Sequence, residues 1–128
     1  MRPNESSYSD DWFEIAEKDL KRARYLLDGK DVEGAGFNIQ QAVEKYLKGY
    51  LLSRGWQLRR IHNLETLLNE AIKYHAAFEE FRAVCQKITQ YYVEERYPVV
   101  TASDLTEDEI TASLLAAENI IARIKAIV

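Results

Sequence analysis

The chain has 128 residues, of which 47% are hydrophobic and 30% are charged, and its formal net charge is −4. The apolar content excludes a disordered chain, and the length fits one compact domain. The net negative charge argues against a protein that coats nucleic acid through its overall field, so a phosphate site would have to be local.

The spacing of apolar residues predicts five helices and no strands. Residues 1–8 are expected to form a flexible tail, and residues 9–128 a single domain. The first helix is expected to begin at Ser9, whose hydroxyl would cap the first backbone N–H groups, and to end at Gly29 in a left-handed turn. The second helix is expected over residues 31–55, which makes it the long central element.

A short third helix is expected over residues 63–74 and a long fourth helix over residues 77–95. The fourth must stop there because Pro98 has no backbone N–H and disfavours helical geometry in the residue before it. The fifth begins after Thr106, which forms a capping box with Glu109. The predicted fold is all-α, an antiparallel up-and-down bundle of four long helices plus one short helix.

Several classes of protein and site are disfavoured by the sequence. No apolar run reaches the ~18–20 residues of a membrane span, and the polar N-terminal segment lacks the apolar core of a signal peptide. Cys85 is the single cysteine and lies on an apolar stripe, which indicates a core position. His62 and His75 have no partner at metal-ligand spacing, and there is no glycine-rich phosphate loop. We expect a cytoplasmic protein without membrane contact, metal or cofactor.

A polar series on the second helix is the first feature that could carry chemistry. Its members are Gln40, Gln41, Glu44, Lys45 and Lys48, which share faces at helical spacing. The simpler interpretation is a solvated face with one favourable pair between Glu44 and Lys48.

A basic window is the second feature, since no acidic residue occurs from Lys45 to Leu64. Arginine side chains suit phosphate oxygens, and Trp56, inside the window, could stack on a base. The alternative is a basic helix end that complements the helix dipole, followed by a solvated loop. The basic residues of the window are Lys45, Lys48, Arg54, Arg59, Arg60 and His62.

The third feature is the end of the fourth helix, where Tyr91, Tyr92 and Tyr97 surround Arg96. These side chains could form a stacking and hydrogen-bonding site. They could equally lock the helix end against its neighbours.

Four segments occur in an order and spacing that resembles the HEPN domain family, from Trp12 to the end of the last helix. They are WFEIAEKDLKRARYLL, FNIQQAVEKYLKGYLLSRG, IHNLETLL and YYVEERYP. The resemblance implies a bundle of four or five helices, often a homodimer, and many members are encoded beside a minimal nucleotidyltransferase. Some of these pairs act as toxin and antitoxin. The family is associated with nucleotide binding, and its active members are metal-independent ribonucleases.

Active members of that family carry an arginine with a histidine four to six positions later. Arg96 matches the arginine by its place in the chain, but residues 97–103 contain no histidine. A ribonuclease would then lack a general acid/base, whose help is typically worth ~10²–10⁴-fold. The resemblance therefore implies a non-catalytic nucleotide- or RNA-binding module, a dimeric partner of a nucleotidyltransferase. The residues expected to bind phosphate are Lys45, Lys48, Arg54, Arg59, Arg60, His62 and Arg96.

Two alternatives remain open at the level of sequence. One is a toxin-like ribonuclease with an altered active site, for which the candidate residues are Arg96, Tyr92, Tyr97 and His62. The other is a structural scaffold whose only role is dimerisation, through an apolar helix face.

Overall fold

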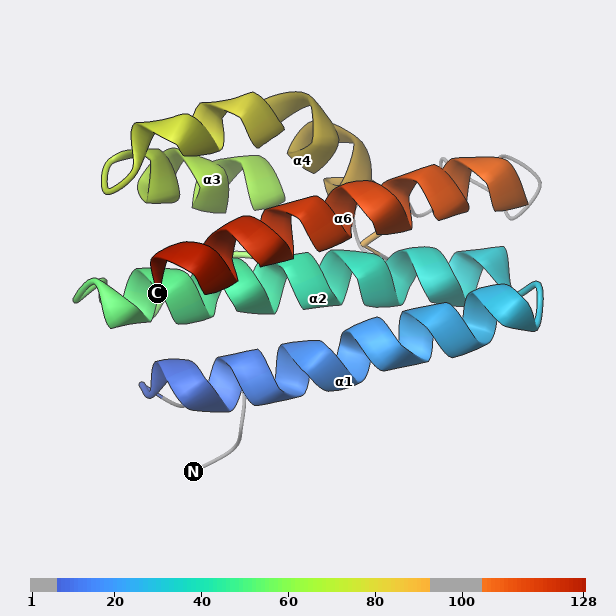
Figure 1. Ribbon diagram of the computed structural model, residues 1–128, viewed down its shortest axis with the longest axis horizontal. Helices are drawn as coiled ribbons and strands as arrows, with labels where there is room; N and C mark the ends of the chain where they lie inside the picture. Colours follow the sequence, from blue (N-terminus) through green and yellow to red (C-terminus); the bar gives the residue numbers. More distant parts are fainter. Residues whose placement is uncertain (1–6, 93–104) are drawn as a thin grey trace.

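The computed structural model describes residues 7–92 and 105–128, and all regular structure in these residues is helical (Figure 1). The predicted all-α bundle is therefore confirmed. Its elements are the α-helices α1 (Ser9–Asp28), α2 (Val32–Ser53) and α3 (Leu64–Ile72), the 3₁₀ helix η2 (Ala76–Phe81), and the α-helices α4 (Arg82–Thr89) and α6 (Glu107–Ile127).

The directions of the helices follow an up-and-down order. α1 runs against α6, because Glu17 pairs with Lys125 at 2.9 Å, whereas Arg24, later in α1, pairs with Glu118, earlier in α6, at 2.7 Å. α2 and α6 run in the same direction, with their C-terminal ends together in Figure 1, where Arg54 donates to the carbonyl of Ile127 at 3.1 Å. α3, η2 and α4 pack as a short second layer over one end of α2 and α6.

α1 begins at Ser9 as predicted, but the capping at its two ends differs from the prediction. Tyr8 occupies the N-cap position without a side-chain hydrogen bond and Ser9 is the first helical residue, so the predicted Ser9 cap is wrong. At the other end Gly29 has a φ of −83°, and the left-handed conformation belongs to Lys30 with a φ of 65°. The helix continues to Asp28, which moves the left-handed position one residue later. Gly55, near the predicted end of the second helix, has a φ of 87° and makes a left-handed turn after α2.

α2, α3 and α6 begin close to the predicted positions, and each has a side-chain cap. Asp31, Asn63 and Thr106 each accept the backbone N–H of the residue three positions later, at 2.9, 3.0 and 3.1 Å. Such caps satisfy N–H groups that have no partner within the helix. The short polar residues at these positions therefore fix where α2, α3 and α6 begin.

The predicted fourth helix is built in two pieces and is shorter within the described residues. It opens as the 3₁₀ turn η2, and α4 ends at Thr89 instead of continuing to residue 95. The Thr89 hydroxyl accepts the backbone N–H of Leu64 at 3.0 Å, and the buried Tyr91 hydroxyl lies 2.9 Å from that of Ser113. These contacts with α3 and α6 fix the chain where helical spacing alone predicts a longer helix. The predicted stop at Pro98 lies outside the described residues.

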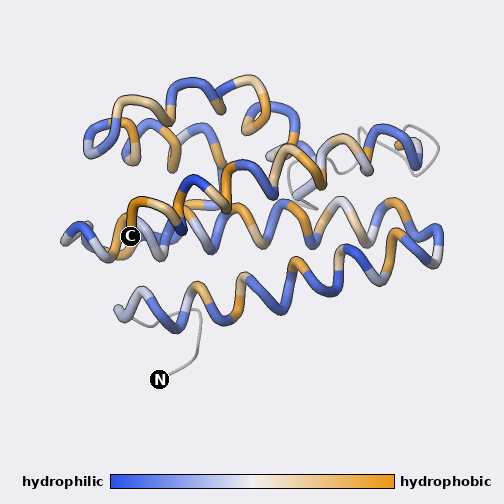
Figure 2. The backbone as a smooth tube through the Cα atoms, in the orientation of Figure 1, coloured by the Kyte–Doolittle hydropathy of each residue, from blue (hydrophilic) through white to orange (hydrophobic). Residues whose placement is uncertain are grey.

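α2 is the central element, and it contacts α1, α3, α4 and α6. Most of the apolar residues of α2 are buried. Figure 2 shows hydrophilic and hydrophobic residues recurring in turn along α1. Gly49 allows α1 to approach closely, because a Cβ atom there would lie 2.5 Å from a ring carbon of Phe13. In the part of the chain that the structure describes, no helix is long and apolar enough to cross a membrane.

Candidate functional site

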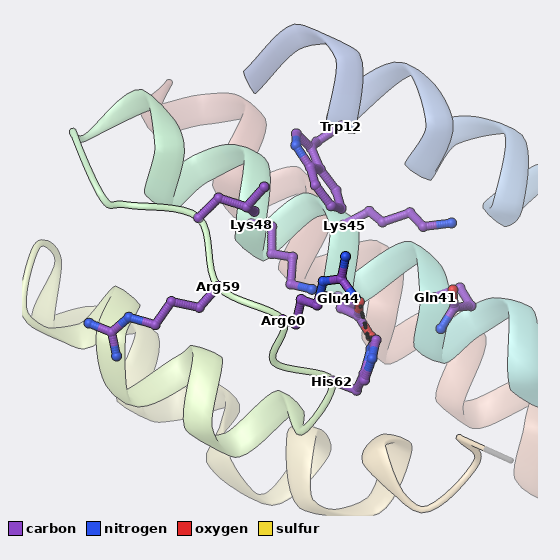
Figure 3. Close-up of a pocket in the computed structure, with 9 residues that line it drawn as sticks. Trp12, Gln41, Glu44, Lys45, Lys48, Arg59, Arg60 and His62 are labelled. Carbon is purple, nitrogen blue, oxygen red and sulfur yellow. Dashed lines mark hydrogen bonds and ion pairs between the residues drawn. The ribbon is translucent and has the colours of Figure 1, made fainter. Parts of the chain in front are cut away.

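A cavity of about 410 Å³ opens between α1, α2 and the loop that joins α2 to α3 (Figure 3). This volume falls within the range of small-molecule sites. Four cationic side chains and one carboxylate take part in its lining. The lining residues are Trp12, Gln41, Glu44, Lys45, Lys48, Leu58, Arg59, Arg60 and His62.

The inner wall of the cavity holds a buried ion pair. Lys48 Nζ lies 3.0 Å from Glu44 Oε2, and both side chains are only 4% exposed. Lys48 Nζ also lies 5.4 Å from the ring centroid of Trp12, which is itself buried. The interpretation of this helix face as solvated is therefore wrong. Since buried charges are tolerated only when paired, Glu44 and Lys48 depend on each other.

His62 is tied to α2 through both its ring and its backbone. Its Nδ1 lies 3.2 Å from each carboxylate oxygen of Glu44. Gln40 Nε2 donates to the His62 carbonyl and to Glu44 Oε1, each at 3.1 Å. A carboxylate only accepts, so Nδ1 carries the hydrogen and Nε2 is directed away from Glu44. The ring also stacks on Tyr92, with centroids 4.7 Å apart.

The other cations that line the cavity differ in how they are held. Lys45 Nζ lies 2.5 Å from the buried carboxylate of Asp19. Arg59 is 59% exposed and lies 3.6 Å from Glu70, with its guanidinium 6.0 Å from the ring centroid of Trp56. Arg60 is exposed on the same loop. The arginines are thus the more accessible cations, whereas Lys45 and Lys48 lie deeper.

The structure brings together most of the residues predicted to bind phosphate. Five of them line the cavity, namely Lys45, Lys48, Arg59, Arg60 and His62. Arg54 does not, because it extends to the end of α6 and lies over the Tyr50 ring. Tyr92 joins the group through its stack on His62, while Arg96 and Tyr97 lie outside the described residues.

Two residues of the site were not predicted from the sequence. Trp12 is a buried residue of α1, and its ring also walls the cavity. Asp19 is 4% exposed and accepts from both Lys45 and Arg22. In the sequence, Asp19 lies between the apolar positions Ala16 and Leu20, which are buried in the structure. A carboxylate at such a position requires a charged partner, and this pattern could have identified it.

Other titratable side chains offer less to a ligand. Burial raises the pKa of the Cys85 thiol to about 12, as suits the predicted core position. Over residues 7–92 and 105–128, no group of three or more His, Cys, Asp or Glu side chains is arranged to hold a metal ion.

The family model of the HEPN domain matches residues 9–127, so the chain belongs to the HEPN domain family. Two solved structures are similar to it, each with 28% sequence identity. The crystal structure of TT1696 from Thermus thermophilus has a TM-score of 0.81 and covers 92% of this chain and 96% of its own. ST0689, an archaeal HEPN homologue, has a TM-score of 0.77, with 93% and 96% covered. No match was found among curated proteins.

Proposed function

We propose that this protein is a nucleotide- or RNA-binding module that holds phosphate groups in the cavity between α1 and α2. The observation that supports it is that Lys45, Lys48, Arg59 and Arg60 line one cavity, in which Glu44 is the only carboxylate among the described residues. Guanidinium groups bind phosphate oxygens through paired hydrogen bonds. The exposed arginines make the first contacts, and Lys45 and Lys48, which are paired with Asp19 and Glu44, lie behind them.

Calorimetry with ATP, GTP and a short RNA tests the binding site. Charged hydrogen bonds contribute roughly 1.5–3 kcal/mol each, so Arg59→Ala/Arg60→Ala should weaken binding at least ~10-fold. The matched control is Lys30→Ala/Lys87→Ala, which removes two exposed cations outside the cavity. Equal affinities of the wild type and the arginine variant would refute the site.

The module is further proposed to act as a non-catalytic, dimeric partner of a nucleotidyltransferase in the cytoplasm. The family membership supports this proposal, as does the lack of a histidine in the seven residues that follow Arg96. Light scattering coupled to size-exclusion chromatography tests the dimer. Co-expression with the product of the adjacent gene tests the partnership. A monomeric protein would contradict the proposed dimer, and failure to co-purify with a nucleotidyltransferase would contradict the proposed partnership.

A metal-independent ribonuclease with an altered active site is the second candidate. The observation that favours it is the placement of His62, whose ring is oriented by Glu44 and stacked on Tyr92 beside a cationic cavity. A carboxylate–imidazole pair of this kind can serve as a general base. Incubation with total RNA in a chelating buffer separates the candidates. Cleavage that His62→Ala or Arg96→Ala abolishes would replace the non-catalytic assignment.

A further inference from the structure

The cavity between α1 and α2 is joined to a second depression by one shared carboxylate. Asp19 lies 2.5 Å from Lys45 Nζ through one oxygen and 3.1 Å from Arg22 Nη1 through the other. Lys45 lines the cavity, whereas Arg22 lines a shallow depression on the outer surface of α1. The two features therefore meet where these cations share Asp19.

The outer depression has the chemistry of a nucleic-acid surface. It is lined by Lys18, Lys21, Arg22, Tyr25 and Leu26, and these five residues are named together as the α1 basic face. The Tyr25 side chain is among the most exposed large apolar groups of the described residues, with 78% of its surface accessible. Exposed aromatic rings among cations are the elements on which single-stranded bases stack while phosphates are held.

The carboxylates along this route are compensated. Asp19 and Glu44 are both buried. Asp19 pairs with Lys45 and Arg22, and Glu44 pairs with Lys48. The exposed carboxylates Asp11 and Glu14 share this side of α1 by helical spacing, so the positive charge is weaker at the start of the helix than in its middle. The strongest positive stretch thus runs from the cavity past Lys45 and Arg22.

We propose that a single-stranded RNA segment lies along the seam of α1 and α2, from the cavity to the α1 basic face. The proposal rests on the proposed function, since one phosphate of the strand occupies the cavity. From Trp12 to Tyr25 the route covers about 20 Å at ~1.5 Å per residue. At ~3.4 Å per stacked nucleotide this length takes about six nucleotides, far more than a mononucleotide fills.

Fluorescence anisotropy with a labelled, unstructured RNA of about 12 nucleotides tests the route. Lys18→Ala/Arg22→Ala should weaken RNA binding about tenfold and reduce the salt slope by about 1.4, because two phosphate contacts are lost. Tyr25→Ala should weaken it about fivefold or more through lost stacking. ATP affinity, measured by calorimetry, should stay within about twofold, because these residues lie outside the cavity lining.

The matched control is Arg24→Ala/Lys125→Ala, which removes the same charge from the ion pairs between α1 and α6, away from the α1 basic face. An equal loss in this control would show a general charge effect and overturn the route. So would unchanged RNA binding in Lys18→Ala/Arg22→Ala, or equally tight binding of a duplex RNA. If the wild type binds ATP but binds the RNA no more tightly than ATP, the route is refuted and the proposed function is not. If the wild type binds neither ligand, the proposed function is refuted as well.

Discussion

His62 Nδ1 lies 3.2 Å from both carboxylate oxygens of Glu44, although the two residues are 18 positions apart in the chain. The same carboxylate pairs with Lys48, and Gln40 holds the His62 carbonyl. One turn of α2 therefore positions the loop that carries Arg59 and Arg60. The stability of the central helix and the shape of the cavity therefore both depend on the buried Glu44 carboxylate.

Lys48→Ala should lower the free energy of unfolding by about 3–5 kcal/mol, because it leaves the Glu44 carboxylate buried without its cation. Urea unfolding of the purified variant measures this change. Lys30→Ala is the control, since the Lys30–Glu107 pair is 75% and 52% exposed and its loss should cost at most about 0.5 kcal/mol. A Lys48→Ala variant as stable as this control would show that the pair is not buried in solution.

Glu17→Gln should reduce the sensitivity of the protein to acid. Lys125, at 2.9 Å, and the Tyr46 hydroxyl donate to Glu17 and lower its pKa below the usual 4.5, despite partial burial. A depressed folded-state pKa stabilises the fold above the unfolded-state pKa, and this stabilisation is lost as the pH falls through the folded-state value. Melting temperatures from about pH 6 to about pH 3 should therefore fall less steeply in Glu17→Gln than in the wild type.

Glu14→Gln removes an exposed carboxylate from the same helix and serves as the control for this series. Its melting curve should follow the wild type across the range. If Glu17→Gln and the wild type lose stability in parallel, the bonds from Lys125 and Tyr46 do not stabilise the folded state.

The Cys85 thiol should resist disulfide reagents in the folded protein. Burial raises its pKa to about 12, so that almost none of the reactive thiolate forms near neutral pH. Reaction should proceed rapidly only in urea, after unfolding. Ala83→Cys introduces an exposed thiol on the same helix for comparison, and a native Cys85 that reacts as fast would contradict the buried position.

Local rules account for much of the fold. The caps at Asp31, Asn63 and Thr106 depend on neighbouring residues, so three helix starts were predictable. The end of α4 depends on contacts of Thr89 with Leu64, which is distant in sequence, and helical spacing carries no information about such contacts.

The site was predictable to a similar degree. The window without acidic residues, from Lys45 to Leu64, contains all the cationic residues that line the cavity. It also contains Arg54, which instead donates to a carbonyl at the end of α6. The burial of Glu44 and Lys48 was missed, because an i,i+4 pair has the same sequence pattern on a solvated helix as on a central one. The role of Asp19 as a shared partner emerges only when α1 and α2 are placed side by side.

The central claim is that phosphate ligands occupy the cavity between α1 and α2. The most direct measurement is a nitrogen-15 NMR titration of the wild type with ATP, followed by the same titration of Arg59→Ala/Arg60→Ala. The account predicts that the Trp12 indole N–H and the Gln41 side-chain amide shift in the wild type and not in the variant. No shift of these signals, or the largest shifts at the groove of Val84, Lys87 and Ala116 between α4 and α6, would contradict it.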